Sequence, residues 1–415
     1  MKIAIFAETY LPYLNGVVTH ISVLKSGLEK LGHEVLIVSA DAHAKHHYIE
    51  NGILHCPAVT SKRIYGYGLA SPLSQKRLNM ILKFNPDIIH VQTEFGVGLS
   101  GIMIAKFLRI PLVYTLHTMY DDYIYYVAPS KLVPLVKKLS HGYAKIIAGS
   151  VNAITGPSVK IQDYFQSHGV KKPVNIIPNT IEIEKFDPNN FSDEQKRELK
   201  QRYNISDGQM IAIFVGRIGK EKSVDVLLEY WAQTIKPEDG IRLLIVGGGP
   251  DSESLQELAK TLNLDSMVTF TGPVPHEEVA SYYAISDVFV TASLSEVYSM
   301  TVLESMASGL PVLQRFDELI SNQIQAGKNG FFFNSATEMA SVLRILKRKN
   351  PEDMKKMREA VINSVKDSGA ESLAKSLLEI YTGLTGKKKY KKATQLRDSI
   401  NNSKIKLTKL HRVKK

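Results

Sequence analysis

The chain has 415 residues, of which 44% are hydrophobic and 22% charged, so it can bury a large core and we expect two domains. Its single cysteine, Cys56, excludes an internal disulfide and a cysteine-based metal cluster, and is typical of a reducing cytosol. The formal net charge of +11 comes from segment 387–415, which holds 12 Lys and Arg residues and one acid, while the remainder is balanced.

The N-terminus indicates neither secretion nor membrane insertion. Its apolar run, MKIAIFAE, reaches Glu8 too soon for a signal peptide, and nowhere do eighteen apolar residues follow one another. We therefore expect a cytoplasmic protein.

Alternating strand and helix patterns predict a first doubly wound α/β domain over residues 1–180. A strand at 2–7, a helix ending at Gly32 and a strand at 35–39 form a βαβ unit, which implies a parallel sheet. Further strands are expected at 87–91, 112–116, 153–156 and 175–177, with helices at about 99–108 and 158–169. Gly16 follows the first strand, where glycine either lets the backbone approach a ligand or forms a plain turn.

His117 comes directly after the strand at 112–116, at the sheet edge where ligands bind. It could donate a hydrogen bond to a sugar hydroxyl, or it could cap and pack. Asp121 and Asp122 follow, but no Asp-x-Asp occurs in the chain, so we predict no metal site.

A basic amphipathic segment follows at 126–147. It mixes leucines and valines with lysines, among them Lys131, Lys137 and Lys138. Such a helix suits an anionic lipid surface, although the same pattern also fits an ordinary surface helix with an apolar inner face.

The alternation restarts and predicts a second doubly wound domain over 205–366, after a linker rich in polar residues and proline. Strands are expected near 211–216, 241–246, 267–272 and 287–292, with helices between them and a charged helix at 351–366. A last helix, within about 368–385, is expected to pack back on the first domain.

Arg217 and Lys222 lie in VGRIGKEK, at the carboxyl edge of the second sheet. Two cations there can neutralise a diphosphate, Arg through its planar fork and Lys as a point charge, whereas the alternative is a pair of surface cations. The nearby VGGGPD lacks the spacing of a dinucleotide-binding loop and favours a tight turn.

The stretch from Ser293 to Pro311 sets two glutamates around a predicted helix start. Ser299 can cap the helix, which leaves Glu296 on the loop and Glu304 on the helix. Unpaired N–H groups and the helix dipole could hold a diphosphate, while the carboxylates accept hydrogen bonds from sugar hydroxyls. Alone, the spacing is also typical of a solvated helix.

Segment 387–415 begins with five lysines, Lys387, Lys388, Lys389, Lys391 and Lys392. If it is helical, Leu396, Ile400, Leu407 and Leu410 share one stripe, which favours a membrane surface over a nucleic-acid arm. The alternative is a disordered, solvated tail.

Together these motifs resemble those of the retaining glycosyltransferases of the GT-B fold, in which two Rossmann-like domains face a cleft. The resemblance is specifically to the large family that includes sucrose synthases, phosphatidylinositol mannosyltransferases and bacterial diacylglycerol glucosyltransferases. The resemblance covers residues 1 to about 381 and rests on NGV, His117, VGRIGKEK, VGGGP and SLSEVYSMTVLESMASGLPV. ETYLPYLNGVVTHI and HTMYDDYIYY are most similar to the diacylglycerol glucosyltransferases. Three positions depart from the family pattern, Asn15, Ser299 and Thr180, and none removes a charged group.

The resemblance implies a role for each matching position. Arg217 and Lys222 would hold the donor diphosphate, Glu304 the nucleotide ribose, and Glu296 with His117 the donor sugar. The backbone positions implied to complete the donor site are Ser299, Met300 and Thr301, with Gly16 letting the N-terminal loop close over it.

The expected reaction transfers a hexose from a nucleotide sugar with retained configuration. Arg217, Lys222 and the helix start would stabilise the departing diphosphate, so neither a metal nor a further cofactor is expected. We find no candidate carboxylate behind the anomeric carbon, which favours front-face attack over double displacement.

Three hypotheses remain open. The first is a peripheral enzyme on the inner face of the cell membrane that makes α-glucosyl-diacylglycerol from UDP-glucose. The second is a transferase using another donor, such as GDP-mannose or UDP-N-acetylglucosamine, and a soluble, inositol-lipid or polysaccharide acceptor. The third is a non-catalytic nucleotide- or nucleic-acid-binding protein, which the intact set of Glu296, Glu304, Arg217 and Lys222 argues against.

Overall fold

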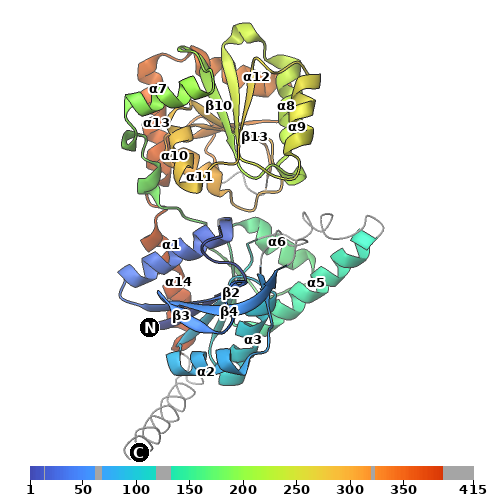
Figure 1. The fold of residues 1–415 in the computed structure, drawn as a ribbon, viewed down its shortest axis with the longest axis vertical. Helices are drawn as coiled ribbons and strands as arrows, with labels where there is room; N and C mark the ends of the chain where they lie inside the picture. Colours follow the sequence, from blue (N-terminus) through green and yellow to red (C-terminus); the bar gives the residue numbers. More distant parts are fainter. Residues whose placement is uncertain (14, 61–67, 118–131, 319–322, 387–415) are drawn as a thin grey trace, which may run out of the picture. The chain divides into compact units, whose positions relative to one another are not determined.

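A computed structural model of the chain describes residues 1–13, 15–60, 68–117, 132–318 and 323–386. The chain forms two compact units (Figure 1): one runs from Met1 to Pro178 and resumes at Ala370, and the other is Asn179–Gly369. Each contains a sheet with helices on both faces, which confirms the predicted pair of doubly wound α/β domains. The predicted lysines Lys131 and Lys387 to Lys392, and the tail as a whole, lie outside the described residues.

The first unit is built on a mostly parallel sheet. Its described strands are β1 (Lys2–Ala7), β2 (Glu34–Asp41), β3 (Tyr48–Glu50), β4 (Ile53–Thr60), β5 (Gly68–Ala70), β6 (Ile88–Val91), β7 (Leu112–Thr115), β8 (Ala153–Gly156) and β9 (Val174–Ile176). Its described helices are α1 (Gly16–Lys30), α2 (Gln75–Phe84), α3 (Gly96–Leu108), α5 (Val133–Ser150), α6 (Val159–Ser167) and α14 (Ala370–Thr385).

The strand order of this sheet places its ligand-binding edge. The order is β3-β4-β2-β1-β6-β7-β8-β9, and the chain leaves β1 toward β2 on one side and reaches β6 on the other. The direction of winding therefore reverses between β1 and β6, the point at which ligands bind in open parallel sheets. Gln92 follows β6, and His117 follows the neighbouring β7.

The second unit has an entirely parallel sheet among its described residues. Its strands are β10 (Met210–Val215), β11 (Ile241–Val246), β12 (Val268–Gly272), β13 (Val288–Thr291), β14 (Val312–Arg315) and β15 (Gly330–Phe333). Its described helices are η4 (Ile183–Phe186), η5 (Pro188–Asn190), α7 (Asp193–Arg202), η6 (Lys220–Lys222), α8 (Val224–Thr234), η7 (Pro237–Asp239), α9 (Ser252–Thr261), α10 (His276–Ala284), α11 (Met300–Ala307), α12 (Ala336–Arg348) and α13 (Pro351–Val365).

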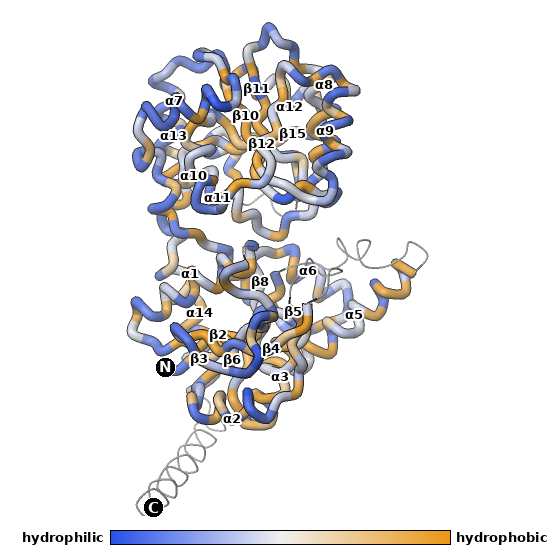
Figure 2. Tube along the Cα trace, viewed as in Figure 1, coloured by the Kyte–Doolittle hydropathy of each residue, from blue (hydrophilic) through white to orange (hydrophobic). Residues whose placement is uncertain are grey.

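Burial on both faces explains why these strands are continuous apolar runs. Ile211, Ala212 and Ile213 of β10 are fully buried, as are Leu243 to Val246 of β11. Figure 2 shows this apolar character along the sheet, and Figure 1 shows α8, α9 and α12 on one side with α10, α11 and α13 on the other. The order β12-β11-β10-β13-β14-β15 reverses between β10 and β13, which places the second ligand-binding edge there.

The last helix completes the core of the first unit. Leu373, Leu377 and Tyr381 of α14 are buried against α1 and the underlying strands. The two helices approach so closely at Gly27 that a Cβ there would lie 2.2 Å from the carbonyl oxygen of Ala370. Glycine is therefore required by packing at this position.

Several elements were not anticipated from the sequence. These are β3, β4, β5, α2, α7, β14, β15 and α12, together with the short helices η4, η5, η6 and η7. At the N-terminus, the Asn15 side chain accepts a hydrogen bond from the Val18 backbone and caps α1, so Gly16 is the first residue of that helix. Among the described residues, no helix combines the length and apolar character needed to cross a membrane.

We expect Gly27→Ala to destabilise the first unit by about 2 kcal/mol, because the added methyl group overlaps backbone of α14 that cannot move alone. The measurement is thermal or urea unfolding. Gly142→Ala is the matched control: Gly142 lies in α5, and a methyl group added there would meet no described atom within 4 Å, so this variant should leave stability unchanged or raise it. Equal stability of the two variants would contradict the packing described here.

Candidate donor site in the second unit

Two loops meet where the strand order of the second unit reverses. One follows β10 and carries Arg217 and Lys222; the other follows β13 and carries Ser293, Ser295 and Glu296 before α11 begins. Because β10 and β13 are parallel neighbours, their carboxyl ends lie at the same edge of the sheet. The predicted cations and carboxylate are thereby brought together.

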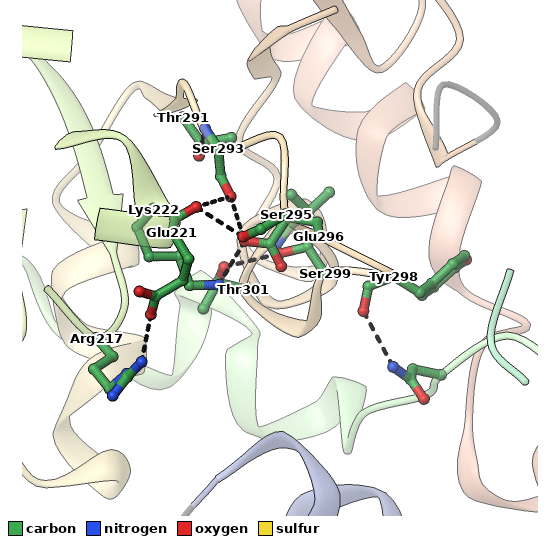
Figure 3. A network of polar contacts seen from close by, with 12 residues as sticks. Arg217, Glu221, Lys222, Thr291, Ser293, Ser295, Glu296, Tyr298, Ser299 and Thr301 are labelled. Carbon is green, nitrogen blue, oxygen red and sulfur yellow. Dashed lines mark hydrogen bonds and ion pairs between the residues drawn. The ribbon is translucent and has the colours of Figure 1, made fainter. Parts of the chain in front are cut away.

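Each predicted cation is paired with a carboxylate (Figure 3). Lys222 Nζ lies 2.6 Å from Glu296 Oε1, and this ion pair joins the two loops. Arg217 Nη2 lies 2.6 Å from Glu221 Oε1, whose side chain is almost completely buried. The Glu221 carbonyl accepts hydrogen bonds from Ser295 Oγ at 2.7 Å and Ser293 Oγ at 3.2 Å. The network holds both cations at the sheet edge.

The glycine-rich segment VGGGPD holds the Arg217 loop in place. A Cβ at Gly247 would lie 2.0 Å from the Gly216 carbonyl oxygen, and one at Gly249 would lie 2.1 Å from that of Ile218. The Ile218 N–H also donates to the Gly248 carbonyl at 3.0 Å. The segment is thus a tight backbone contact beside Arg217, in agreement with the turn favoured from its sequence.

The start of α11 is fixed by hydrogen bonds from the side chains of Ser299, Gln323 and Asn179. Ser299 caps the helix by accepting from the Val302 N–H at 3.4 Å. Gln323 clamps the Ser299 backbone, accepting from its N–H at 3.1 Å and donating to its carbonyl at 3.2 Å. Asn179 donates to the carbonyl of Tyr298 at 3.1 Å. Met300 and Thr301 stand in the first turn, where a helix offers no internal acceptor for backbone N–H groups.

Glu304 lies buried on α11 and has partners from α10. The Tyr283 hydroxyl donates to Glu304 Oε2 at 3.1 Å, and His276 Nε2 lies 3.6 Å from Oε1. Burial, and then the nearby Glu304 charge, raises the pKa of Tyr283 well above its usual value, so this phenol remains a donor. The neighbouring Glu304 carboxylate raises the pKa of His276 despite its partial burial.

His117 and Gly16 belong to the first unit rather than to this network. His117 Nε2 lies 2.5 Å from Gln92 Oε1, and the rings of His117 and His20 contact edge to face with centroids 4.7 Å apart. Burial, followed by the neighbouring His20 and His90, holds the pKa of His117 well below its ordinary value.

Several residues of this site were missed from the sequence: Glu221, Tyr283, His276 and Gln323. Glu221 stands inside the VGRIGKEK motif, so its charge beside two cations was a usable signal. The other three come from segments distant in sequence, and only the fold brings them to α11. Among the described residues, no group of three or more His, Cys, Asp or Glu side chains is arranged to hold a metal ion.

Comparison with known families places each part of the chain among carbohydrate-transferring proteins. Residues 195–367 match the family "Glycosyl transferases group 1", and residues 14–185 match "Glycosyltransferase Family 4". The chain is 34% identical over 397 residues to the alpha-monoglucosyldiacylglycerol synthase of Acholeplasma laidlawii, covering 93% of this chain and 98% of the relative. The synthase of the same name from Streptococcus pneumoniae is also 34% identical, over 83% of this chain and 77% of its own.

Solved structures agree at the level of the fold. HepE of Anabaena, crystallised with UDP and glucose, superposes with a TM-score of 0.69 at 17% identity, over 92% of this chain and all of its own length.

We expect Glu304→Gln to lower the pKa of His276, because it removes the carboxylate that stabilises the imidazolium. An NMR titration of the His276 ring protons measures this directly. Glu277→Gln is the matched control, since the charge of Glu277 affects the pKa of His276 less than that of Glu304 does. An unchanged midpoint in Glu304→Gln would show that the contact is not formed in solution.

Proposed function

The chain belongs to the group 1 glycosyltransferases of the GT-B fold, and on that premise we propose that it transfers glucose from UDP-glucose to diacylglycerol at the membrane surface, with retained α configuration. The observation that carries the proposal is the Arg217, Lys222 and Glu296 network beside the start of α11. The names of the two 34% identical synthases support the lipid acceptor and the sugar.

The network suits the diphosphate of a nucleotide sugar. A guanidinium has five N–H donors and an ammonium three, so each cation can bind its carboxylate and a phosphate oxygen together. The paired carboxylates also hold the two long side chains in place, which lowers the entropy lost on binding. The first-turn N–H groups of α11 add a positive dipole end. Glu304, fixed by Tyr283, is suited to accept hydrogen bonds from ribose hydroxyls.

The proposed chemistry needs no nucleophilic carboxylate. The acceptor oxygen attacks the anomeric carbon on the face from which the diphosphate departs, the bond from that carbon to the diphosphate oxygen breaks, and a diphosphate oxygen takes the hydroxyl proton. Negative charge grows on the diphosphate, where Arg217, Lys222 and the α11 dipole stabilise it by preorganised electrostatics. Because these groups supply positive charge, we propose that turnover is independent of added metal.

The membrane surface is proposed from an apolar face of the first unit. Leu135, Leu139 and Ile146 of α5 are 56%, 65% and 68% exposed and share one stripe of the helix. The exposed Lys138 and Lys145 lie along one border of this stripe, whereas Lys137 is half-buried on the opposite side of the helix. Phe107 of the neighbouring α3 is 73% exposed, and α3 is joined to α5 by the Lys106–Ser150 hydrogen bond. Figure 2 shows the apolar segments of both helices.

A lipid bilayer with anionic headgroups matches this surface, since apolar side chains would enter the interface while the lysines meet phosphate. We propose a peripheral protein on the cytoplasmic face of the membrane, where nucleotide sugars and diacylglycerol meet. The Phe107 contribution was not predicted from the sequence.

The decisive assay measures UDP released from UDP-glucose by the purified chain on vesicles with and without diacylglycerol, in the presence of chelator. We expect turnover that requires diacylglycerol. Arg217→Ala should lower kcat by about 10²- to 10³-fold, the usual loss for one group that stabilises developing charge. Lys356→Ala, which removes a cation of an exposed pair on α13, is the control and should retain activity. Turnover only with another nucleotide sugar would refute UDP-glucose as the donor. Turnover without lipid would refute diacylglycerol as the acceptor.

Membrane attachment has its own test. Leu139→Glu should weaken co-sedimentation with anionic vesicles about tenfold or more, because it replaces a membrane-entering side chain with a charge of the same sign as the lipid. Ile345→Glu changes a similarly exposed residue on α12, 59% against 65%, and should bind like the unchanged chain. Equal weakening by both variants would contradict a lipid surface at α5.

A further inference from the structure

A line of buried polar groups runs through the first unit from the last helix to His117. The Tyr381 hydroxyl of α14 lies 2.6 Å from His90 Nδ1, and Thr115 Oγ1 lies 2.7 Å from His90 Nε2. The Gln92 side chain stands between His90 and His117, and the Gln92 backbone N–H donates to the Phe6 carbonyl at 2.8 Å. His90, Gln92 and Tyr381 are all at most 2% exposed.

The neutral ring of His90 decides how the Gln92 amide is turned. Burial, and then His20, lowers the pKa of His90 to about 3, so the ring is uncharged near neutral pH. The amide nitrogen of Gln92 lies 3.3 Å from both ring nitrogens. Tyr381 and Thr115 already form hydrogen bonds with the two ring nitrogens, so the Gln92 amide meets the face of the ring. An N–H group there contacts the π electrons of a neutral imidazole favourably, whereas an amide oxygen would be repelled. The oxygen of Gln92 therefore faces His117.

This orientation fixes where His117 carries its proton. Gln92 Oε1 can only accept, so His117 Nε2 must be the donor across their 2.5 Å contact. A neutral imidazole has a single N–H, which leaves Nδ1 with a lone pair. The titratable groups that face His117 are His20 on α1 and His90 on β6, and both disfavour a charge on it.

We propose that Gln92 is a positioning residue that holds His117 in its Nε2–H form, so that Nδ1 accepts a hydrogen bond from a hydroxyl group of the substrate. This reverses the expectation that His117 donates to a sugar hydroxyl. The identity of the hydroxyl as part of a glycosyl transfer substrate rests on the proposed function, whereas the tautomer of His117 does not.

Long-range proton–nitrogen NMR of ¹⁵N-histidine-labelled protein reads the tautomer without any substrate. We expect His117 to show a protonated Nε2 and an unprotonated Nδ1. Gln92→Leu removes the acceptor and should give a mixture of the two tautomers. A protonated Nδ1 in the unchanged chain, or the same pure Nε2–H form in Gln92→Leu, would overturn the proposal.

The kinetic experiment separates positioning from a general packing role. Gln92→Leu should lower kcat/KM about tenfold or more, the effect of losing one hydrogen bond to the reacting complex. Gln92→Glu keeps an acceptor of nearly the same shape and should retain activity at high pH. Its carboxylate raises the pKa of His117, so the imidazole becomes charged below that pKa and Nδ1 can no longer accept. Activity of Gln92→Glu should therefore fall as the pH falls, with an acid limb absent from the unchanged chain.

The outcomes distinguish the two claims. Full activity of Gln92→Leu, or a pH profile of Gln92→Glu that matches the unchanged chain, would refute the positioning role. If the unchanged chain turns over no nucleotide sugar, the proposed function fails, and the tautomer measured by NMR still confirms or rejects the part played by Gln92. Thermal unfolding of each variant shows that it is folded; should Gln92→Leu fail to fold, Gln92→Glu carries the test.

Discussion

The ion pair between Lys222 and Glu296 joins the two loops on which the second unit's site depends. Each residue follows a different parallel strand, and the 2.6 Å contact fixes the distance between a cation suited to phosphate and a carboxylate suited to hydroxyl groups. Breaking it by removing one partner would leave the other charge partly desolvated, which costs far more than the pair contributes to stability. The neighbouring pair of Arg217 with the buried Glu221 is subject to the same constraint. The conformation of these two loops therefore depends on both ion pairs remaining intact.

The first unit uses neutral groups where the second uses charged ones. His117, Gln92 and His90 form a line of uncharged hydrogen-bonding partners, because desolvation and the neighbouring imidazoles keep both rings unprotonated. The difference fits the two kinds of chemistry in glycosyl transfer. A diphosphate needs positive charge that is held in place, whereas hydroxyl groups need donors and acceptors of fixed direction and little charge. Fixed direction in a neutral network depends on which atom carries each proton, so a single amide such as Gln92 sets the polarity of its neighbours.

Much of the fold follows from the sequence, and some of the site does. Continuous apolar strands such as β10 and β11 are predictable because burial on both faces of a sheet leaves an unbroken apolar run. The helix α8 at 224–234 is predictable because its buried residues recur at spacings of three and four. Arg217 was singled out because it follows a predicted strand, and Glu296 because it precedes the predicted start of a helix. The strands β3 and β5 have only three residues each, too few to show a period. The contacts of Tyr283 with Glu304 and of Gln323 with Ser299 span 21 and 24 residues, and no local pattern encodes which distant side chain completes a helix start.

The return of α14 to the first unit has a consequence for the order in which the chain folds. Leu377 and Tyr381 fill the core beneath α1, yet they are synthesised only after the whole of Asn179–Gly369. The second unit is continuous in sequence and can reach its native state during synthesis. The first must wait with part of its apolar surface uncovered, and closing it joins segments more than three hundred residues apart. The first unit therefore begins to be synthesised first but completes its core last.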